Sequence, residues 1–419
     1  MSGGDTTVVV TGLGAFTPLG TTVKETWTAL LDGRSAVAKL DEPWAARLPV
    51  RLAARAAADP AELLGRVPAR RLDRVGQFGV LAVREAWADA GFVEPAGAHG
   101  GPDPDRVAVV LGTGVGGVHT IVDNHEQLRN HGPRKVSPLA LPMLMNNHAA
   151  AQAALEIGAR AQATAPSTAC AAGAEAVAAG LDLIRLGRAD VVAVGGTDAG
   201  VHPLIVAGFA QMRALSARND EPGRASRPFD HARDGFVLAE GAAVLILERA
   251  SHAEARGVRG YCTLAGAGLS SEAHHITSPH PDGAGMASAM RRMLSDARLE
   301  AGDVGHVHAH ATSTGGGDVA ESRAIGSVLG LGTVPVSAIK SMTGHLLGAA
   351  GALGAVASVL TLVNRVAPPT ANLDDLDDRI DVDVVGTFPR ELPAAPRAAV
   401  CNAAGFGGHN VSLAFTPHP

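Results

Sequence analysis

Short runs of small apolar residues alternate with longer stretches rich in alanine and leucine along most of the chain. The runs are continuously apolar rather than alternating in polarity, which is typical of strands covered by helices on both faces. Strands are predicted at 8–11, 107–111, 191–194, 243–247, 307–309, 334–338 and 399–401. Helices are predicted at 23–32, 73–90, 171–186 and 285–297. This alternation predicts a layered α/β protein.

The pattern divides near residue 255. A charged stretch, 248–260, follows one predicted strand and precedes another apolar run. A chain of 419 residues has room for two or three domain-sized units. Because both sides of the charged stretch are strand–helix alternations, we expect two units, 1–255 and 256–419, although no residue-level repetition is visible between them.

Glycine is abundant and aromatic residues are scarce. Glycine accounts for 51 of the 419 residues and aromatic residues for 3%, so the core is built from small side chains that favour close backbone packing. The hydrophobic content of 46% excludes disorder as the overall state. Collagen is excluded because the glycines have no three-residue period.

Charge and cysteine content restrict the partners and the compartment. The net charge of −6 offers no general attraction for nucleic acid or an anionic membrane. Three cysteines are too few for a disulfide framework, which indicates a reducing, cytoplasmic compartment. No signal-peptide pattern is visible at the N-terminus. The uncharged stretch 346–363 approaches the length of a membrane span, but alanine and glycine dominate it, so we expect a buried helix.

The first candidate for chemistry is Cys170, which follows Ser167-Thr168-Ala169 and precedes a long alanine-rich stretch. Ser167 or Thr168 is placed to cap this helix, which would put Cys170 in its first turn. Free N–H groups and the helix dipole there stabilise a thiolate and a developing oxyanion. Cys170 is therefore a candidate nucleophile, with a buried inert cysteine as the alternative. Cys262 and Cys401 lie in apolar, strand-like runs and are interpreted as inert.

Histidines gather in the second half of the chain. In a strand, the side chains of three histidines would share one face: His306, His308 and His310. This pattern is compatible with two interpretations, a metal site and a single catalytic histidine. His345 opens the uncharged helix, whose N-terminus would keep the imidazole neutral, unless this residue only caps the helix. Lys340 lies at the end of an apolar strand, and a buried lysine needs a carboxylate partner.

Two glycine-rich turns follow predicted strands. Gly405-Phe406-Gly407-Gly408 permits positive φ and close backbone approach around one mobile ring, although an ordinary tight turn is the alternative. The other turn, 112–117, matches G-x-G-x-x-G. Because no second strand ending in an acidic residue follows near 131–134, a nicotinamide site is not predicted.

Together these segments resemble the β-ketoacyl-acyl-carrier-protein synthases, most closely the elongating type II enzymes of fatty acid synthesis and the ketosynthase subunits of type II polyketide systems. The resemblance covers nearly the whole chain and is carried by Thr168-Ala169-Cys170, His310-Ala311-Thr312-Ser313-Thr314, Lys340-Ser341-Met342-Thr343-Gly344-His345 and Gly405-Phe406-Gly407-Gly408. It implies the thiolase fold, with two similar βαβαβαββ halves in α-β-α-β-α layers. It also implies no metal or other cofactor, because the substrates travel on the phosphopantetheine arm of acyl carrier protein.

The resemblance further implies a role for each matching residue. Cys170 takes the acyl chain, and the backbone N–H groups of Cys170 and Phe406 form the oxyanion hole, with Phe406 also acting as a gate. His310 and His345 hydrogen-bond the malonyl thioester and stabilise the enolate left when carbon dioxide departs. Attack of this enolate on the acyl-cysteine gives a 3-oxoacyl product.

Supporting residues follow from the same resemblance. Lys340 and Glu321 are expected to form an ion pair that orders the site. Residues expected to contact the substrates are Val115, Thr277, Thr312, Thr314, Ala404 and Gly405. Residues expected to dock an acidic carrier protein are Arg70, Arg71 and Arg213. The protein is expected to work as a homodimer or as a heterodimer with a chain-length factor.

Two positions depart from the common fatty-acid pattern. Val115 stands where such enzymes often carry isoleucine, and Ala404 stands where many carry phenylalanine. Both changes remove volume near the acyl tunnel or gate, so we hypothesise a pocket for longer, bulkier or unsaturated chains, as in a polyketide or polyene pathway. His308 stands where many relatives carry asparagine and is assigned no chemistry.

Other readings of the same residues differ in one feature each. A non-catalytic chain-length factor usually carries glutamine at the nucleophile position, where this chain has Cys170. A thiolase needs a second cysteine in a C-x-G-type turn, whereas Cys401 precedes Asn402-Ala403. A zinc hydrolase built on the three clustered histidines would be revealed by metal analysis.

Overall fold

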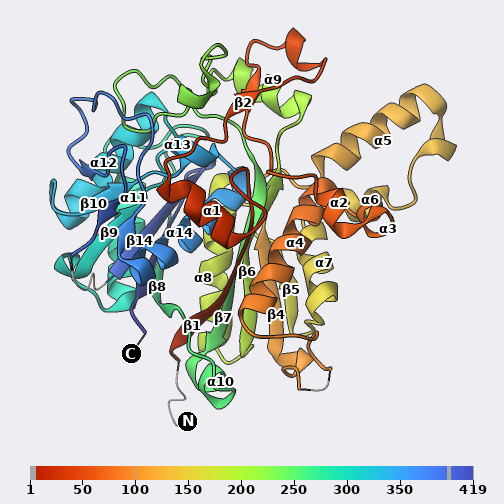
Figure 1. Cartoon of the computed structure of the whole chain (residues 1–419), viewed down its shortest axis with the longest axis horizontal. Coiled ribbons are helices and arrows are strands. Elements are labelled where there is room, and N and C mark those ends of the chain that lie inside the picture. Colours follow the sequence, from red (N-terminus) through yellow and green to blue (C-terminus); the bar gives the residue numbers. More distant parts are fainter. Residues whose placement is uncertain (1–5, 99, 394–397, 419) are drawn as a thin grey trace.

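The computed structural model describes residues 6–98, 100–393 and 398–418 and places them around a mixed sheet of 11 strands (Figure 1). The strands, in their order across the sheet, are β12 (Asp383–Val384), β10 (Pro335–Ser337), β9 (Val304–His308), β14 (Ala398–Gly405), β15 (His409–Thr416), β8 (Cys262–Ser271), β1 (Val8–Phe16), β7 (Glu240–Arg249), β6 (Val191–Ala199), β4 (Val107–Gly112) and β5 (Gln162–Thr164). Each predicted strand is confirmed, with small changes at its ends. The hairpin strand β15 was not predicted, because Ser412 interrupts its apolar run. The Ser412 hydroxyl donates to the side-chain oxygen of Asn402 at 2.9 Å, so the strand keeps a satisfied polar group in its core.

The two halves of the sheet repeat one topology. On one side β4 pairs in parallel with β5 and β6, and β7 then pairs antiparallel with both β6 and β1. On the other side β9 pairs in parallel with β10 and β14, and β15 then pairs antiparallel with both β14 and β8. The structure therefore shows a duplication that residue-level comparison of the halves does not reveal. A boundary at residue 255, the last residue of α10 (Ala250–Ala255), stays a prediction.

Helices form three layers around the two half-sheets (Figure 1). On the outer face of the first half lie α4 (Arg74–Asp89) and α7 (His148–Ile157), and on that of the second half lie α11 (Ala284–Ala297) and α12 (Gly315–Leu329). Between the halves lie α8 (Ala172–Arg185) and α14 (Ala350–Asn364). This gives the expected α-β-α-β-α order. The predicted helices 23–32, 73–90, 171–186 and 285–297 are confirmed as α1 (Val23–Leu31), α4, α8 and α11.

The remaining elements connect these layers and lie mostly around the rim of the sheet (Figure 1). The helices are α2 (Pro60–Leu64), α3 (Arg66–Ala69), α5 (Val118–His131), α6 (Ala140–Leu144), α9 (Pro203–Gln211) and α13 (Lys340–Thr343). Two small antiparallel ribbons join β2 (Ala38–Lys39) to β3 (Leu52–Ala53) and β11 (Val366–Ala367) to β13 (Arg390–Glu391).

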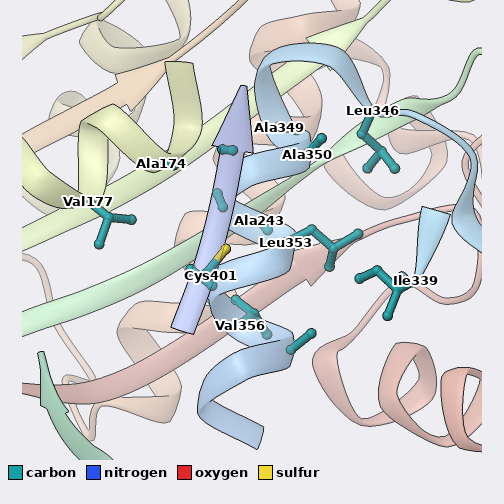
Figure 2. Packing of buried hydrophobic residues seen from close by; sticks show 14 of the residues in the cluster. Ala174, Val177, Ala243, Ile339, Leu346, Ala349, Ala350, Leu353, Val356 and Cys401 are labelled. Carbon is teal, nitrogen blue, oxygen red and sulfur yellow. The ribbon is translucent and has the colours of Figure 1, made fainter. Parts of the chain in front are cut away.

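The uncharged stretch of the sequence is the central helix of the protein. Figure 2 shows α14 packed against β14 at Cys401, with Ala174 and Val177 of α8 nearby. A Cβ atom on Gly351 would lie 2.8 Å from the Ala174 Cβ, so this crossing needs glycine. Among the described residues, Leu347–Asn364 is the one stretch long and apolar enough to cross a membrane, and 83% of it is buried inside the protein. This burial confirms the expectation of a core helix.

Candidate active site

Cys170 lies in a tight turn at the start of the central layer. The 3₁₀ turn η4 (Ala169–Ala171) directly precedes α8, and Ala169 has φ 52°, a conformation that side-chain-bearing residues rarely adopt. The predicted cap is wrong, because neither Ser167 nor Thr168 caps α8. Ser167 instead donates to the carbonyl of Thr113. The turn thus presents Cys170 at the base of a cavity rather than within a capped first helical turn.

The Cys170 thiol is neutral in this conformation. Burial, followed by the charge of Asp198, raises the pKa of Cys170 to about 12. The Lys340 ammonium and the backbone N–H groups of Cys170 and Phe406 lower this pKa by a smaller amount. The sequence suggested a stabilised thiolate, but burial outweighs the favourable dipoles. The two N–H groups nevertheless converge on the sulfur, where an oxyanion would form.

Asp198 is a structural residue of the site that the sequence analysis missed. It ends the apolar run of β6 and is buried, and it accepts hydrogen bonds from the N–H groups of Gly114 (2.7 Å), Val115 (3.1 Å) and Gly348 (2.7 Å). Burial raises the pKa of Asp198 to about 6 despite these donors. The carboxylate joins the turn after β4 to the segment before α14. An acidic residue at the end of a buried, otherwise uncharged strand was the available signal in the sequence.

The glycine-rich hairpin between β14 and β15 packs directly on the cysteine turn. A Cβ atom on Gly405 would lie 2.4 Å from the Thr168 carbonyl oxygen and 3.2 Å from the Cys170 nitrogen. Gly407 has φ 93°, which any other residue would adopt with strain. The close approach at Gly405 is what brings the Phe406 N–H toward the sulfur.

A methyl group at position 405 is therefore expected to disable acyl transfer. In Gly405→Ala, the clash with the Thr168 carbonyl moves the hairpin and withdraws the Phe406 N–H from the oxyanion position. Loss of one such donor costs about 10²–10³ in rate, measurable as acyl-enzyme formation by intact mass. Gly386→Ala is the matched control, because its Cβ would meet no atom within 4 Å. Loading by Gly405→Ala at the rate of this control would contradict the assignment.

His310 and His345 both line the cavity and are in edge-to-face contact with each other. Their ring centroids are 5.5 Å apart and the rings are nearly perpendicular, at 83°. His345 does not open a helix as predicted, because α14 begins only at Ala350 after a 3₁₀ turn. It is held instead by an extended bridge to Leu238, in which its N–H donates to the Val237 carbonyl at 2.7 Å.

Both imidazoles are neutral and carry one nitrogen free for substrate. Burial, and after it the Lys340 charge, holds the pKa of each well below the ordinary 6.5. The Nδ1 atoms of His310 and His345 are buried without a hydrogen-bond partner in the described part of the chain. An unmet N–H costs more than an unmet lone pair here, which favours the tautomer with the proton on Nε2. Each ring thereby becomes a hydrogen-bond donor through Nε2.

Lys340 and Glu321 both hydrogen-bond to the backbone at His310. The Glu321 carboxylate accepts from the N–H groups of His310 and Ala311, both at 2.7 Å, and the Lys340 ammonium donates to the His310 carbonyl. The expected direct ion pair is not formed: among the described residues, none within 4.0 Å joins these two side chains. Burial raises the pKa of Glu321 to about 7, and it lowers the pKa of Lys340. The two charged side chains therefore attract each other from opposite sides of the His310 peptide, which both of them hydrogen-bond.

The segment after His310 is braced by a second buried pair, Arg233 and Asp318. Asp318 accepts from the Ser313 N–H at 3.1 Å, and Arg233 donates to the Thr314 carbonyl at 3.1 Å. The two charged groups lie 3.5 Å apart. They fix the backbone that carries Thr312 and Thr314, whose hydroxyls are 3.1 Å from each other.

A cavity of about 520 Å³ unites most of the predicted site. Predicted residues that line it are Cys170, Thr277, His310, Thr312, Thr314, Glu321, His345, Ala404, Gly405 and Phe406. Val115 does not line it but packs against the same core cluster as Cys170. Arg70 and Arg71 are exposed beside α3, and Arg213 is exposed between two cavity-lining residues, Met212 and Ala214.

Sequence comparison with known protein families decides the class. The N-terminal domain of β-ketoacyl synthase matches residues 5–253, and the C-terminal domain matches residues 261–374.

The chain belongs to the β-ketoacyl synthase family.

Individual relatives agree with this family. The chain is 42% identical to 3-oxoacyl-[acyl-carrier-protein] synthase 2 of Vibrio harveyi, with 97% of the chain and 98% of the relative covered. It is 41% identical to the same synthase of Synechocystis sp., with 97% of both covered.

Solved structures are similar over almost their whole length. A β-ketoacyl synthase from Burkholderia phymatum has a TM-score of 0.90 at 36% identity, covering 99% of this chain and 100% of the other. The ishigamide ketosynthase/chain length factor has a TM-score of 0.88 at 33% identity, covering 99% of both. A type II polyketide ketosynthase in complex with its acyl-carrier protein, AntDE:AntF, has a TM-score of 0.89 at 30% identity, covering 98% and 99%.

The fold is therefore the thiolase-like fold of this family, as expected, and the protein is a 3-oxoacyl synthase, an acyltransferase. Cys401 and His308 of this ketosynthase lie away from the cavity, side by side in the register of β14 and β9. His306 bonds to the Ser337 hydroxyl at 3.0 Å. Over the described ranges, no group of three histidine, cysteine or acidic side chains is arranged to hold a metal.

Proposed function

We propose that this ketosynthase joins an acyl chain held on Cys170 to the two-carbon unit of a malonyl thioester carried by acyl carrier protein. The observation that carries the proposal is the grouping of two neutral imidazoles, each a donor through Nε2, with a cysteine beneath two backbone N–H groups in one cavity. The reaction forms two oxyanions in succession, and each needs its own set of hydrogen-bond donors. The two imidazoles form one set and the two backbone N–H groups form the other.

In the loading half-reaction, the Cys170 sulfur attacks the acyl thioester. A new C–S bond forms and the bond to the carrier's sulfur breaks. The Cys170 proton leaves during attack and is taken up by the departing sulfur of the carrier, which leaves as a thiol, so both imidazoles stay neutral. The N–H groups of Cys170 and Phe406 stabilise the tetrahedral oxyanion.

In the condensing half-reaction, the malonyl thioester carbonyl accepts hydrogen bonds from His310 and His345. The bond to the carboxylate breaks, carbon dioxide leaves, and the electron pair becomes an enolate that the two donors stabilise. The enolate carbon attacks the acyl-Cys170 carbonyl, the C–S bond breaks, the Cys170 sulfur regains a proton from water, and the 3-oxoacyl product remains on the carrier. Lys340 and Glu321 act by fixing the peptide of His310 rather than by touching substrate.

The substrate arm and the partners complete the proposal. Thr277, Thr312 and Thr314 line the cavity and would hydrogen-bond a pantetheine arm, while Arg70, Arg71 and Arg213 would dock an acidic carrier in a cytoplasmic setting. A second subunit, either a copy of this chain or a chain-length factor, would cover α5. Figure 1 shows this helix extending away from the sheet, and its Ile121 and Leu128 are 51% and 47% exposed.

The test is reconstitution with purified carrier protein. Incubation with an acyl-carrier protein is expected to add one acyl group to the protein. Addition of malonyl-carrier protein is then expected to remove that group, release carbon dioxide and give a 3-oxoacyl-carrier product, each detected by intact mass. A loaded enzyme that releases only the hydrolysed acid would argue against condensation.

We also propose that the pocket takes bulky or polyunsaturated acyl chains. Ala404 lines the cavity beside Phe406, and Val115 packs in the Cys170 cluster with the partly buried Phe209 of α9, so both small side chains leave room around the nucleophile. In the double variant Val115→Ile/Ala404→Phe, kcat/KM for polyenoyl-carrier protein is expected to fall about tenfold, with short saturated chains unaffected.

The control for this experiment is Val363→Ile, which adds the same methylene at a position 47% exposed. Unchanged use of polyenoyl chains by the double variant, with equal or better use of saturated ones, would contradict the proposal.

A further inference from the structure

Two arginines without an assigned role line the solvent end of the active-site cavity. Arg323 projects from α12 and Arg379 from the loop after β11, and both line the same cavity as Cys170. Their side chains are 47% and 60% exposed, whereas Cys170 is 8% exposed. Because Thr312 and Thr314 also line this cavity, the two cations lie at the outer end of a polar lining that leads to the nucleophile.

Each guanidinium is oriented by hydrogen bonds to neighbouring residues through some of its N–H groups, and its other N–H groups have no partner within the described part of the chain. Arg323 donates through Nη1 to the Pro281 carbonyl at 3.0 Å. Arg379 donates through Nε and Nη2 to Asp377 at 2.9 and 2.6 Å. Within the described part of the chain, no hydrogen bond uses Arg323 Nε or Nη2, or Arg379 Nη1. Both groups are thus oriented before a ligand arrives, which lowers the entropy cost of binding.

The surrounding acids do not neutralise this pair fully. Asp377 is shared between Arg379 and the buried Arg233, which it meets at 2.8 Å. Asp282 lies 3.8 Å from Arg323 and is 77% exposed, so solvent screens it. Of the two acids that line the cavity, Glu321 accepts the N–H groups at His310, and Glu272 accepts the His280 N–H at 2.6 Å.

We propose that Arg323 and Arg379 form a subsite for the phosphodiester at the outer end of the phosphopantetheine arm. The inference rests on the proposed function, because that function places a pantetheine chain along Thr312 and Thr314. A planar guanidinium matches phosphate geometry and binds it more strongly than a neutral donor does. The chain's net charge of −6 gives no general attraction for phosphate, so recognition depends on these local cations.

The test compares two small thioesters that differ by one phosphate. Decarboxylation of malonyl-pantetheine and malonyl-phosphopantetheine is measured without carrier protein, so that protein docking does not contribute. The unsubstituted enzyme is expected to prefer the phosphorylated thioester about tenfold in kcat/KM, about 1.4 kcal/mol. In Arg323→Gln/Arg379→Gln this ratio is expected to fall to about one, with turnover of malonyl-pantetheine unchanged.

The controls separate charge, fold and function. Arg323→Lys/Arg379→Lys is expected to recover part of the preference by restoring charge. Arg291→Gln, an exposed arginine of α11 outside the cavity lining, is expected to leave the ratio unchanged. An equal preference in the glutamine variant and the unsubstituted enzyme overturns the subsite while the proposed function stands. Failure of the unsubstituted enzyme to use either thioester or malonyl-carrier protein counts against the function itself.

A third substrate identifies the source of the phosphate. Malonyl-coenzyme A presents the same pantetheine with a diphosphate and a nucleotide. It is expected to be used no better than malonyl-phosphopantetheine, because the subsite holds one phosphate group. A strong, arginine-dependent preference for the coenzyme A thioester would assign the pair to a nucleotide-bearing donor and overturn the proposal.

Discussion

Replacement of Cys170 by alanine is expected to abolish acyl loading. Incubation of Cys170→Ala with acyl-carrier protein should give no increase in the intact mass of the protein, because the sulfur that accepts the acyl group is gone and no other cysteine lines the cavity. Cys262 and Cys401 are buried, and burial raises the pKa of the Cys401 thiol to about 12 without any backbone donor aimed at its sulfur.

Two measurements make this result specific. Cys262→Ala removes a thiol of equal size from the core and should still gain one acyl group. Decarboxylation of malonyl-carrier protein by Cys170→Ala should persist, because His310 and His345 do not depend on the sulfur for their geometry. Acylation of Cys170→Ala at another residue would disprove the assignment of the nucleophile.

Removal of either imidazole is expected to slow decarboxylation by a factor of about 10²–10³, the usual cost of losing one preorganised donor at a developing oxyanion. In His310→Ala and His345→Ala, one of two Nε2 donors to the enolate oxygen is missing. The measurement is carbon dioxide release from malonyl-carrier protein. His231→Ala, at an exposed turn position outside the cavity lining, is the matched control and should match the unsubstituted enzyme.

The pH profile tests the protonation state of the same pair. The pKa values of His310 and His345 are lowered by burial and by Lys340 from the ordinary 6.5. A lowered pKa means that protonation begins only well below pH 6.5, so His310 and His345 should impose no acid limb on the decarboxylation rate between about pH 6 and pH 8. A change near pH 7 is expected from Glu321 instead, because burial raises the pKa of this carboxyl to about 7 and it fixes the peptide of His310. Glu321→Gln removes the carboxyl that titrates near pH 7. An acid limb centred at about pH 6.5 that persists both in Glu321→Gln and in a surface-histidine variant, His231→Ala, would show that the active-site pair titrates normally.

The sequence predicted much of this fold because the information is local. Uninterrupted apolar runs such as 191–194 and 243–247 have one stable environment, a strand covered on both faces. The central helix could be separated from a membrane span because alanine and glycine suit close helix packing better than lipid contact. Strand β15 escaped because Ser412 is satisfied by Asn402, a partner ten residues away in the sequence that becomes a neighbour only after the hairpin forms.

The residues of the candidate site could be predicted where the residue type and its immediate neighbours allow few chemical roles. Cys170 followed by an alanine-rich helix, and Phe406 among glycines, are local patterns with few explanations. The role of Asp198 was not predictable in this way, since its three backbone partners come from two segments far apart in the sequence. The sequence predicted a lowered pKa for Cys170, whereas the structure raises it. The helix dipole is a local feature of the sequence, but the burial of the thiol depends on how all the layers pack around it.

The sequence by itself determined the chemical inventory: one candidate nucleophile, a histidine after a strand (His310), a histidine before the uncharged helix (His345), and glycines where backbone must come close. Only the tertiary structure decided how these groups act together. The Lys340–Glu321 clamp on His310, the unpartnered Nδ1 atoms and the two arginines on the cavity rim each depend on distances between elements from different layers. The physical reason is that the protonation state and the hydrogen-bond partners of a group are set by its surroundings after burial. The kind of reaction that a side chain can perform is a property of the side chain itself.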